Sequence, residues 1–312
     1  MSLKSLVLGD CHFCDRVPLR RSDDFLQAQF NKLVALEKLI ISEKDIDGLF
    51  LLGDVFDIPK PSLELVNRVM DHLDRINKLL PLGIYAIVGN HDVHGRVESV
   101  QETALGTLYA SRLVKQLAGK QIIKGIPFLG IDYLVNHTPE IYKGNNQIIL
   151  THNMLIPAPA IFKHILAKDI SPLVSNTTIF AGHYHSPFNV TLLNNSSVIN
   201  PGVLVRTDIA ERKIVPSAVK FEASMYPDLH VNWTRIPLEK DNGESVFNLL
   251  DYKEEKTQKL DLEKFINGLK QSQFESQDLE KLIQEVGTLS KVDEKVIQEA
   301  LERIKSARMV VK

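Results

Sequence analysis

Uninterrupted apolar runs in the first third of the chain predict buried strands. Residues 49–52 (Leu-Phe-Leu-Leu) are apolar throughout, which is typical of a strand covered on both faces of a parallel sheet. Further strands are predicted at 3–8 and 84–88, and apolar residues recur with helical spacing at 25–41 and 63–80. This alternation predicts right-handed crossovers and one parallel sheet, whose three strands end at the same edge.

Shorter apolar runs in the second part of the chain predict a second sheet. They lie at 121–124, 127–131, 147–151, 177–181, 188–193 and 197–200. One helix, near residues 158–167, is expected among them. We therefore expect a second, more antiparallel sheet that packs face to face on the first.

The C-terminal third changes character. Residues 206–240 predict a small β-rich appendage with strands at 218–221 and 229–236. From about residue 241 the chain becomes charged and poor in glycine. Helices are predicted there at 261–270, 277–286 and 292–308. The apolar stripe of the last helix is expected to pack on the helix before it, and a partner-binding surface is the alternative.

Polar side chains that bind metals follow five of the predicted strands. The strand ends carry Gly9-Asp10-Cys11-His12, Gly53-Asp54, Gly89-Asn90-His91, Thr151-His152 and Gly182-His183-Tyr184-His185. Any one of these residues has an ordinary explanation as a turn or cap residue. Five strand ends that all supply such side chains indicate one shared site at the carboxyl edge. Mixed imidazole and carboxylate ligands suit manganese, iron or zinc better than magnesium or calcium.

The spacing leads to an assignment of two cations. Asp54 is expected to bridge them, with one carboxylate oxygen for each. We assign Asp10, His12 and His185 to the first cation, and Asn90, His152 and His183 to the second. A hydroxide between two such cations would attack phosphorus in line. His91 would then protonate the leaving oxygen or bind a phosphate oxygen, and Asp92 would orient His91.

Composition and charge narrow the class of protein. The 312 residues are 44% hydrophobic, which allows one large domain with a sizeable core and a smaller one. The formal net charge is −2, whereas nucleic-acid binders are often strongly basic, so any basic patch must be local.

Cys11 and Cys14 are too few for a disulfide framework, and we interpret this single C-x-x-C pair as packing or loop residues. No stretch approaches the roughly 18 apolar residues of a membrane span, so we expect a cytoplasmic protein without a membrane partner.

The five polar clusters resemble the motifs of the calcineurin-like metallophosphoesterases. They occur in the order of that family and extend over roughly residues 1–205. The resemblance implies an α/β fold, a four-layer αββα sandwich. It also implies two divalent metal ions, with manganese as our expectation and iron or zinc as alternatives.

Four further segments resemble the SbcD-type DNA-repair nucleases within that family. They are Arg21-Ser22-Asp23-Asp24-Phe25, Gly53-Asp54-Val55-Phe56-Asp57 with Pro61-Ser62, Gly125-Ile126-Pro127-Phe128, and the stretch from Asn200 to Glu211. The resemblance implies a DNA exonuclease or endonuclease of repair and recombination. The nuclease domain would span 1–211, a small β-rich cap 212–250, and a C-terminal helical segment 251–312. That segment would bind an SMC-like ATPase of the SbcC type, and a homodimer is expected by analogy.

A DNA substrate requires cationic groups near its phosphates. Arg20, Arg21, Lys60 and Arg206 lie on loops near the predicted metal edge and are candidates for these contacts. Because the net charge is nearly neutral, ordinary solvated loop residues are the alternative interpretation. The role of Asp57 is left open, since many relatives have a histidine at that position.

Two other functions remain in view. The same metal site would serve a phosphodiesterase or phosphatase that acts on a small-molecule phosphoester, and the motifs do not separate these substrates. A long open groove with a basic rim would favour DNA, and a closed pocket would favour a metabolite. A non-catalytic scaffold, such as the retromer subunit that shares this fold, is disfavoured by the full ligand set and by His91.

Overall fold

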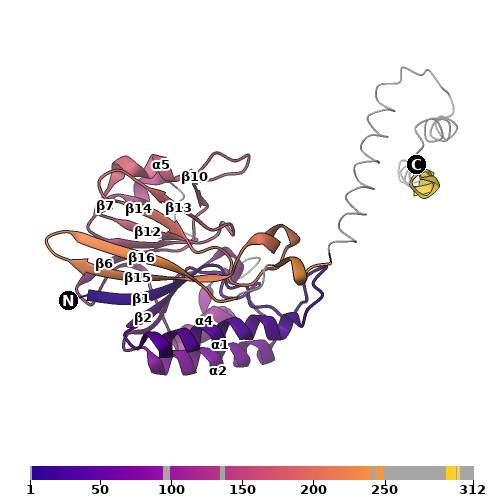
Figure 1. Cartoon of the computed structure of the whole chain (residues 1–312), viewed down its shortest axis with the longest axis horizontal. Helices are drawn as coiled ribbons and strands as arrows, with labels where there is room; N and C mark the ends of the chain where they lie inside the picture. The colour runs from indigo at the N-terminus through magenta and orange to yellow at the C-terminus, as the bar shows by residue number, and fades with distance from the viewer. Residues whose placement is uncertain are drawn as a thin grey trace, which may run out of the picture. The chain divides into compact units, whose positions relative to one another are not determined.

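The computed structural model describes residues 2–93, 99–133, 138–239, 243–248, 293–299 and 301–302. The chain divides into two compact units, Met1–Phe247 and Asn248–Lys312. All strands of the described residues belong to the first unit (Figure 1). In the second unit, residues 294–299 and 301–302 are helical and fall within a predicted helix. The other two helices predicted there, at 261–270 and 277–286, lie outside the described residues.

The first sheet has six strands in the order β16-β15-β1-β2-β3-β4. Its parallel part consists of β1 (Ser2–Leu8), β2 (Gly48–Leu51), β3 (Gly83–Ala86) and β4 (Val114–Gln116). β15 (Ser217–Met225) pairs antiparallel with β1, and β16 (Leu229–Pro237) forms the edge. The strands of the expected cap at 212–250 are thus part of the main sheet. The reason is that β15 forms its ladder along β1 as well as with its hairpin partner.

The second sheet also has six strands, in the order β13-β14-β12-β8-β6-β5. Its central strands are β6 (Ile126–Ile131), β8 (Ile148–Thr151), β12 (Thr178–Ala181) and β14 (Ser197–Asn200), and they run parallel. Only the edge strands β5 (Gly119–Ile123) and β13 (Phe188–Thr191) are antiparallel. The expectation of a more antiparallel second sheet is therefore wrong, because each sheet has a parallel centre.

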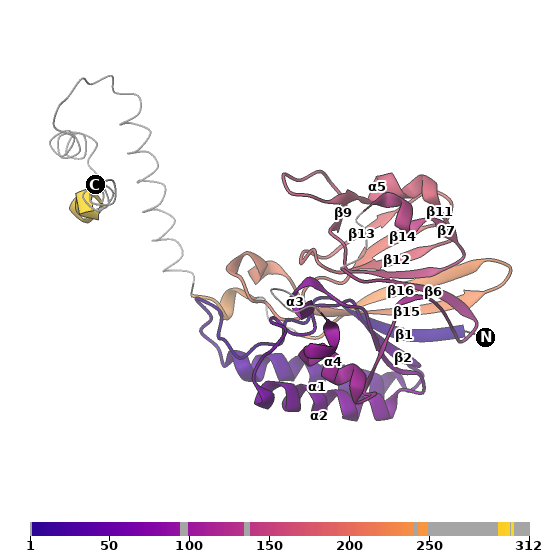
Figure 2. The ribbon, with the colours of Figure 1, turned by 180° about the vertical axis from the view of Figure 1, so that it is seen from behind.

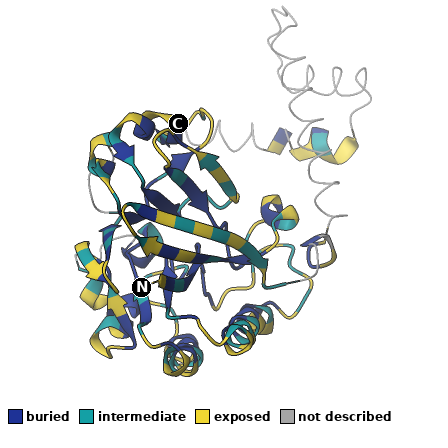
Figure 3. Cartoon of the chain, turned by 60° about the vertical axis from the view of Figure 1, so that its left-hand side comes forward, coloured by how far each residue is buried: buried dark blue, intermediate teal, exposed yellow. Residues whose placement is uncertain are grey.

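The two sheets pack face to face through large apolar side chains. The rings of Phe50 and Phe128 lie 5.1 Å apart, and those of Phe180 and Phe221 lie 5.1 Å apart. Each pair joins one sheet to the other, and all four side chains are fully buried. This layer of interlocking side chains is the centre of the sandwich. Figure 3 shows that the inner strands of the sandwich are largely buried.

Helices cover the outer face of the first sheet (Figure 1). α1 (Phe25–Glu43) and α2 (Leu63–Leu79) bury one apolar side each, and α4 (Ala104–Ala110) lies beside them. Asp24 and Ser62 cap the first two helices by accepting a bond from the backbone N–H three residues on. α1 and α2 confirm the helices predicted at 25–41 and 63–80, whereas α4 was not predicted.

The outer layer of the second sheet is thin. It contains α5 (Ala167–Ile170) and the 3₁₀ turns η2 (Pro139–Tyr142) and η3 (Ser171–Leu173). Side chains of α5 and η2 pack with the sheet in one core cluster. Short strand pairs add to it: β7 (Gly144–Asn145) with β11 (Val174–Ser175), and β9 (Leu155–Ile156) with β10 (Ile165–Leu166).

The prediction of a helix at 158–167 is wrong, since Pro157 and Pro159 lie in a loop there. With this layer the first unit is an αββα sandwich. None of the helices in the described part of the chain has the length and apolarity to cross a membrane.

Candidate metal centre

The predicted ligands lie at the carboxyl ends of strands from both sheets. Asp10 and His12 follow β1, Asp54 follows β2, Asn90 opens α3 (Asn90–Val93) after β3, His152 follows β8, and His183 and His185 follow β12. α3 lies at the end of the first sheet that is remote from the N-terminus (Figure 2). The structure therefore brings all seven residues to one edge of the sandwich, as expected for parallel strands that end together.

Two glycines allow the strand ends to approach this closely. Gly53 has a φ of +88°, and a Cβ there would lie 2.7 Å from the backbone nitrogen of Gly89. A Cβ on Gly89 would lie 2.1 Å from Asp54 Oδ1. Asp54, His12 and His183 themselves have φ values of 47°, 48° and 70°, which are uncommon outside glycine. Such strained positions persist only where packing enforces them, and they cluster at functional sites.

Each of the two carboxylates has one anchored oxygen and one free oxygen. Asp10 Oδ1 accepts a hydrogen bond from the backbone N–H of His183 at 2.8 Å, and Asp54 Oδ1 accepts one from that of His91 at 2.7 Å. The Oδ2 atoms of Asp10 and Asp54 are buried and accept no hydrogen bond from the described residues. Buried carboxylate oxygens without a partner are costly, so a cation fits this pair of atoms.

Three groups of ligand atoms each lie within 4.8 Å of one another. They are Asp10, His12 and His185; Asp54, His152 and His183; and His12, Asp54 and His91. In the first group the Nε2 atoms of His12 and His185 are 3.1 Å apart, and in the second His152 Nε2 lies 3.0 Å from Asn90 Oδ1. The first two groups coincide with the two sets assigned from the sequence. The donor chemistry of both sets therefore fits two divalent cations.

The position of Asp54 corrects one detail of that assignment. Its Oδ2 lies 3.2 Å from His152 Nε2 and 3.7 Å from His12 Nε2, so this single oxygen faces both groups. The other oxygen is occupied by the backbone of His91. Oδ2 is therefore the atom that the two cations would share, in place of the expected one oxygen for each.

The ligand histidines are held in the tautomer that metal binding requires. His152 donates from Nδ1 to the carbonyl of Leu52 at 2.6 Å, which leaves Nε2 as a ligand atom. The Nδ1 atom of His12 lies 3.2 Å from the Asp57 carboxylate, which places an acceptor beside this nitrogen while Nε2 faces the ligand atoms of His185 and Asp54. Partners on the second nitrogen fix the ring orientation and raise the basicity of the ligand.

Glu211 provides the equivalent support for His185, a role that the sequence analysis missed. Its carboxylate accepts from His185 Nδ1 and also from the backbone N–H groups of Thr207 and Asp208, at 2.7 and 3.1 Å. The signal was present, since Glu211 ends the segment that resembles the SbcD-type nucleases. Only the fold shows that its partner is a ligand histidine.

Asp57, and not Asp92, holds the predicted acid His91. His91 donates from Nδ1 to the backbone carbonyl of Asp57 at 2.7 Å, and this nitrogen lies 3.6 Å from the Asp57 carboxylate. The buried Asp92 carboxylate instead accepts from the backbone N–H groups of Val55 and Gly89, at 3.1 and 2.9 Å. The predicted orienting role of Asp92 is therefore wrong: Asp92 fixes the ligand-bearing turns, and Asp57 orients His91.

Electrostatics at the centre favour added positive charge. Burial disfavours protonation of His152, but the adjacent Asp54 carboxylate raises the pKa of His152 to about 10. Although burial acts in the opposite direction, His152 in turn lowers the pKa of Asp54 well below its usual range. Burial together with the charge of His152 lowers the pKa of His183 to about 4. The paired carboxylates thus attract a positive charge, and divalent cations satisfy the same demand.

The four candidate DNA contacts divide into two kinds. The side chain of Arg206 is fully buried and lies 2.9 Å from the Glu239 carboxylate, and that of Arg21 is 1% exposed within another ion pair. These two predictions are wrong, because both guanidinium groups are used inside the fold. Lys60 is exposed and Arg20 is partly exposed, so these side chains stay candidates.

The two cysteines are buried core residues, as predicted. Both are free, and Cys11 and Cys14 belong to the core cluster beneath α1. Burial raises the pKa of the Cys14 thiol to about 12. A thiol of this kind is inert, so neither cysteine contributes to the centre.

Comparison with known proteins agrees with this geometry. Residues 3–210 match the calcineurin-like phosphoesterase family, which uses a dinuclear divalent metal site. No curated protein matches the chain. Among solved structures it is similar to a 5'-nucleotidase precursor from Thermus thermophilus, with 13% identity and a TM-score of 0.43 over 82% of this chain and 59% of that one. The family match covers two thirds of the residues and every predicted metal ligand, so the chain belongs to the calcineurin-like phosphoesterases, a family of metal-dependent phosphoester hydrolases.

Proposed function

We propose that this protein hydrolyses phosphodiester bonds in DNA with two manganese ions. The observation that carries the hydrolytic part is the pair of free, buried oxygens on Asp10 and Asp54, which face the histidine nitrogens from both sheets. The choice of DNA is supported by the segments that resemble the SbcD-type nucleases.

The residues present would hold the cations in two sets. Asp10, His12, Asp54 and His185 form one set, and Asp54, Asn90, His152 and His183 form the other. When bound, the two ions supply an activated water and offset negative charge on the phosphate. Glu211 would keep the ring of His185 in place through its hydrogen bond with Nδ1, and the Asp57 carboxylate lies 3.2 Å from Nδ1 of His12.

His91 is the residue available for proton transfer. Because its Nδ1 proton is donated to the Asp57 carbonyl, Nε2 is the nitrogen that exchanges a proton with substrate. The ring lies edge-on to that of His12 with 4.7 Å between centroids, which places it beside the first ligand set. It would protonate the leaving oxygen or hydrogen-bond a phosphate oxygen.

Accessibility of the centre favours a large substrate over an enclosed metabolite. The side chains of His91 and Asp57 are 40% and 35% exposed, so the proton-transfer side of the centre faces solvent. Lys60 is exposed three residues beyond Asp57, where it can meet a phosphate of the chain.

A substrate panel tests the proposal. The purified full chain with manganese is given a plasmid, labelled DNA oligonucleotides, bis-p-nitrophenyl phosphate and a nucleoside monophosphate. We expect manganese-dependent cleavage of DNA and of the model diester. Hydrolysis of the monophosphate and model diester with all DNA left intact would instead support the small-molecule phosphoesterase.

We further propose that residues 251–312 bind an SMC-like ATPase subunit. This proposal rests on the sequence resemblance alone. Co-purification of the full chain with an SbcC-type ATPase, compared with a chain that ends at residue 247, tests it. Equal recovery of the ATPase with both chains would contradict the proposal.

A further inference from the structure

A cavity of about 140 Å³ lies beside the metal centre. Its lining is Tyr133, Met154, Lys163, His164, Ile165 and the predicted ligand His183. Tyr133 follows β6, and His183 follows β12. The other four lie around the β9–β10 pair: Met154 just before β9, Lys163 and His164 in the connection, and Ile165 at the start of β10. The cavity therefore continues directly from the second ligand set. We call it the base pocket.

Tyr133 is the wall shared by the base pocket and the metal centre. Its ring centroid lies 5.5 Å from that of His183 and 6.3 Å from that of His152. Its backbone N–H donates to the carbonyl of Val88, in the turn that leads to Asn90, at 3.0 Å. This anchor holds an aromatic ring next to the place where a phosphate would bind.

The remaining lining combines apolar surface with polar groups at the rim. Met154 and Ile165 are apolar, and Ile165 is buried. Lys163 is exposed and cationic. His164 donates from Nδ1 to the carbonyl of Phe162 at 2.6 Å, which leaves Nε2 as the nitrogen that can bond to a ligand. An aromatic wall, an apolar floor, one cation and one imidazole nitrogen match a flat ring whose edge carries hydrogen-bonding groups.

The size of the pocket limits the ligand. Drug-sized ligands occupy pockets of about 300–1,000 Å³, and this cavity is less than half of the lower value. The pocket therefore has room for one ring system and not for a whole nucleotide. The phosphate of such a nucleotide would lie outside the pocket, at the metal centre. Stacking of a nucleobase on an aromatic side chain is tolerant of base identity.

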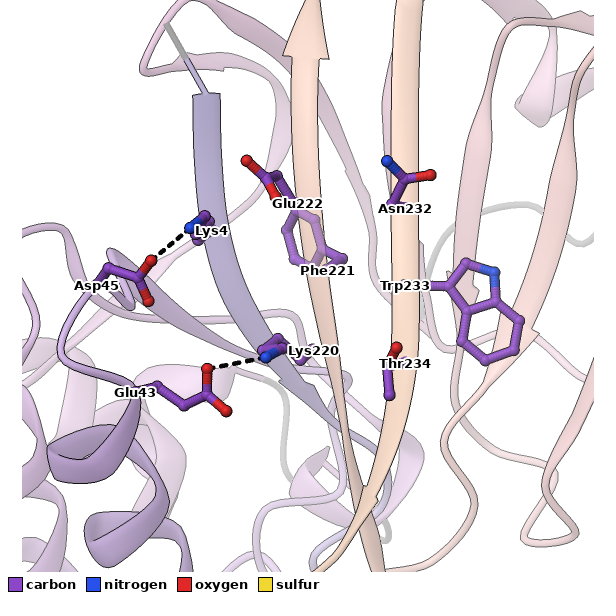
Figure 4. Close-up of a pocket in the computed structure, with 9 residues that line it drawn as sticks. All are labelled: Lys4, Glu43, Asp45, Lys220, Phe221, Glu222, Asn232, Trp233 and Thr234. Carbon is purple, nitrogen blue, oxygen red and sulfur yellow. Dashed lines mark hydrogen bonds and ion pairs between the residues drawn. The ribbon is translucent and has the colours of Figure 1, made fainter.

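A second cavity elsewhere on the first unit lacks this combination. It lies over β1, β15 and β16, and Figure 4 shows that its lysines are already paired, Lys4 with Asp45 and Lys220 with Glu43. It has no contact with the predicted ligands. Both of its lysines are thus already paired with carboxylates, which leaves neither to bind a substrate phosphate.

We propose that the base pocket binds the nucleobase attached to the scissile phosphate, with Tyr133 as the stacking platform and Lys163 at its polar rim. This inference rests on the proposed function, since it assumes a nucleotide phosphodiester as substrate. It adds that the enzyme recognises the base and not only the phosphate.

Competitive inhibition tests the inference. The manganese-loaded full chain hydrolyses bis-p-nitrophenyl phosphate in the presence of one of two competitors, thymidine 5'-monophosphate or 2-deoxyribose 5-phosphate, which lacks the base. The inhibition constant of each competitor is measured. For the wild type we expect the first inhibitor to bind at least about 10-fold more tightly, because only its base can stack on the aromatic side chain. In Tyr133→Leu this ratio should fall to about 1, and Tyr133→Phe should restore it. Lys163→Ala should reduce it about 3-fold, through loss of one polar contact at the rim.

Matched controls separate this result from a general loss of structure. Tyr226→Leu changes a tyrosine that is 87% exposed near the start of β1, and Lys120→Ala changes an exposed lysine on β5. Both should retain the wild-type ratio. Equal inhibition of the wild type by the two compounds, or an unchanged ratio in Tyr133→Leu, would overturn the base pocket while hydrolysis of the diester still stands. Absence of any hydrolysis by the wild type would refute the proposed function itself.

Discussion

The two central aspartates show how single atoms determine this site. In each carboxylate a backbone N–H occupies Oδ1 and leaves Oδ2 buried without a hydrogen bond from the described residues. The donors are the N–H groups of His91 and His183, so the same turns that supply functional side chains also orient the aspartates. A small backbone shift at these turns would therefore disturb several ligands together.

His91→Ala should abolish proton transfer while leaving the cations in place. Because His91 lies outside the two assigned ligand sets, we expect kcat on DNA to fall by about 10²–10⁴-fold, the usual range for a lost general acid. Metal content measured by mass spectrometry should remain two ions per chain. His230→Ala, on the exposed side of β16, is the control. Normal DNA cleavage by His91→Ala would show that His91 has no catalytic role.

Asp57→Asn tests the support that this carboxylate gives to the ring of His12, because the backbone carbonyl that holds His91 is kept in this variant. Its Oδ1 lies 3.2 Å from His12 Nδ1 and 3.6 Å from His91 Nδ1. We expect a loss in activity of about 10–100-fold together with weaker manganese binding, since removal of such a supporting group typically has this effect. Titration calorimetry with manganese provides the second measurement. Asp45→Asn, in an exposed pair with Lys4, should change neither quantity, and a mutant of Asp57 that behaves likewise would contradict the assignment.

The β15–β16 hairpin connects elements that are distant in sequence. Two residues beyond β16, the Glu239 carboxylate lies 2.9 Å from Arg206 and 3.2 Å from Lys32 on α1. Both cations are buried, and burial lowers the pKa of Lys32 even though Glu239 opposes that shift. This one anion therefore compensates two buried cations and ties the hairpin to α1 and to the segment before Glu211.

Glu239→Gln should destabilise the protein by about 3 kcal/mol, because it leaves two buried cations without their counter-charge. The free energy of unfolding is measured from urea denaturation. Glu222→Gln, an exposed position on β15, should change it by less than about 0.5 kcal/mol. A Glu239 variant as stable as the wild type would show that the three charges do not form a structural unit.

In the first unit as a whole, each cation would join the two sheets. The first ligand set takes Asp10 and His12 from the first sheet and His185 from the second. The second set takes Asp54 and Asn90 from the first sheet and His152 and His183 from the second. Bound ions would thus cross-link the two halves of the sandwich at its functional edge.

Removal of metal should therefore lower the melting temperature. With manganese at about 100 times its dissociation constant, binding adds about 2.7 kcal/mol, which raises the melting temperature of a domain this large by roughly 5–10 °C. Differential scanning fluorimetry after EDTA treatment and after return of manganese measures the shift. Asp54→Asn should remove the response to manganese. If the wild type showed no shift with manganese, the cross-linking role of the centre would be refuted.

The main strands of both sheets, α1, α2 and the grouping of the seven candidate ligands at one edge followed from the amino-acid pattern. Buried strands are marked by continuous apolar runs, and parallel strands must end at a common edge, so residues such as Asp10, Asp54 and His183 could be grouped without coordinates. Local rules of this kind also located α1, α2 and the strands of the hairpin. They failed at residues 158–167, where the proline-bearing loop interrupts the helix.

The three-dimensional arrangement alone selected the partners of these residues. Contacts between segments far apart in the chain place Asp57, and not Asp92, beside His91 and place Glu211 beside His185. Such contacts also turn Asp54 Oδ2 toward both histidine groups and pair β15 with β1. Arg206 illustrates the reason: a charged residue in a loop sequence is equally compatible with solvent and with a buried ion pair. Only the positions of Glu239 and of the surrounding core decide between them, because the cost of burying a charge depends on which opposite charge the fold places beside it.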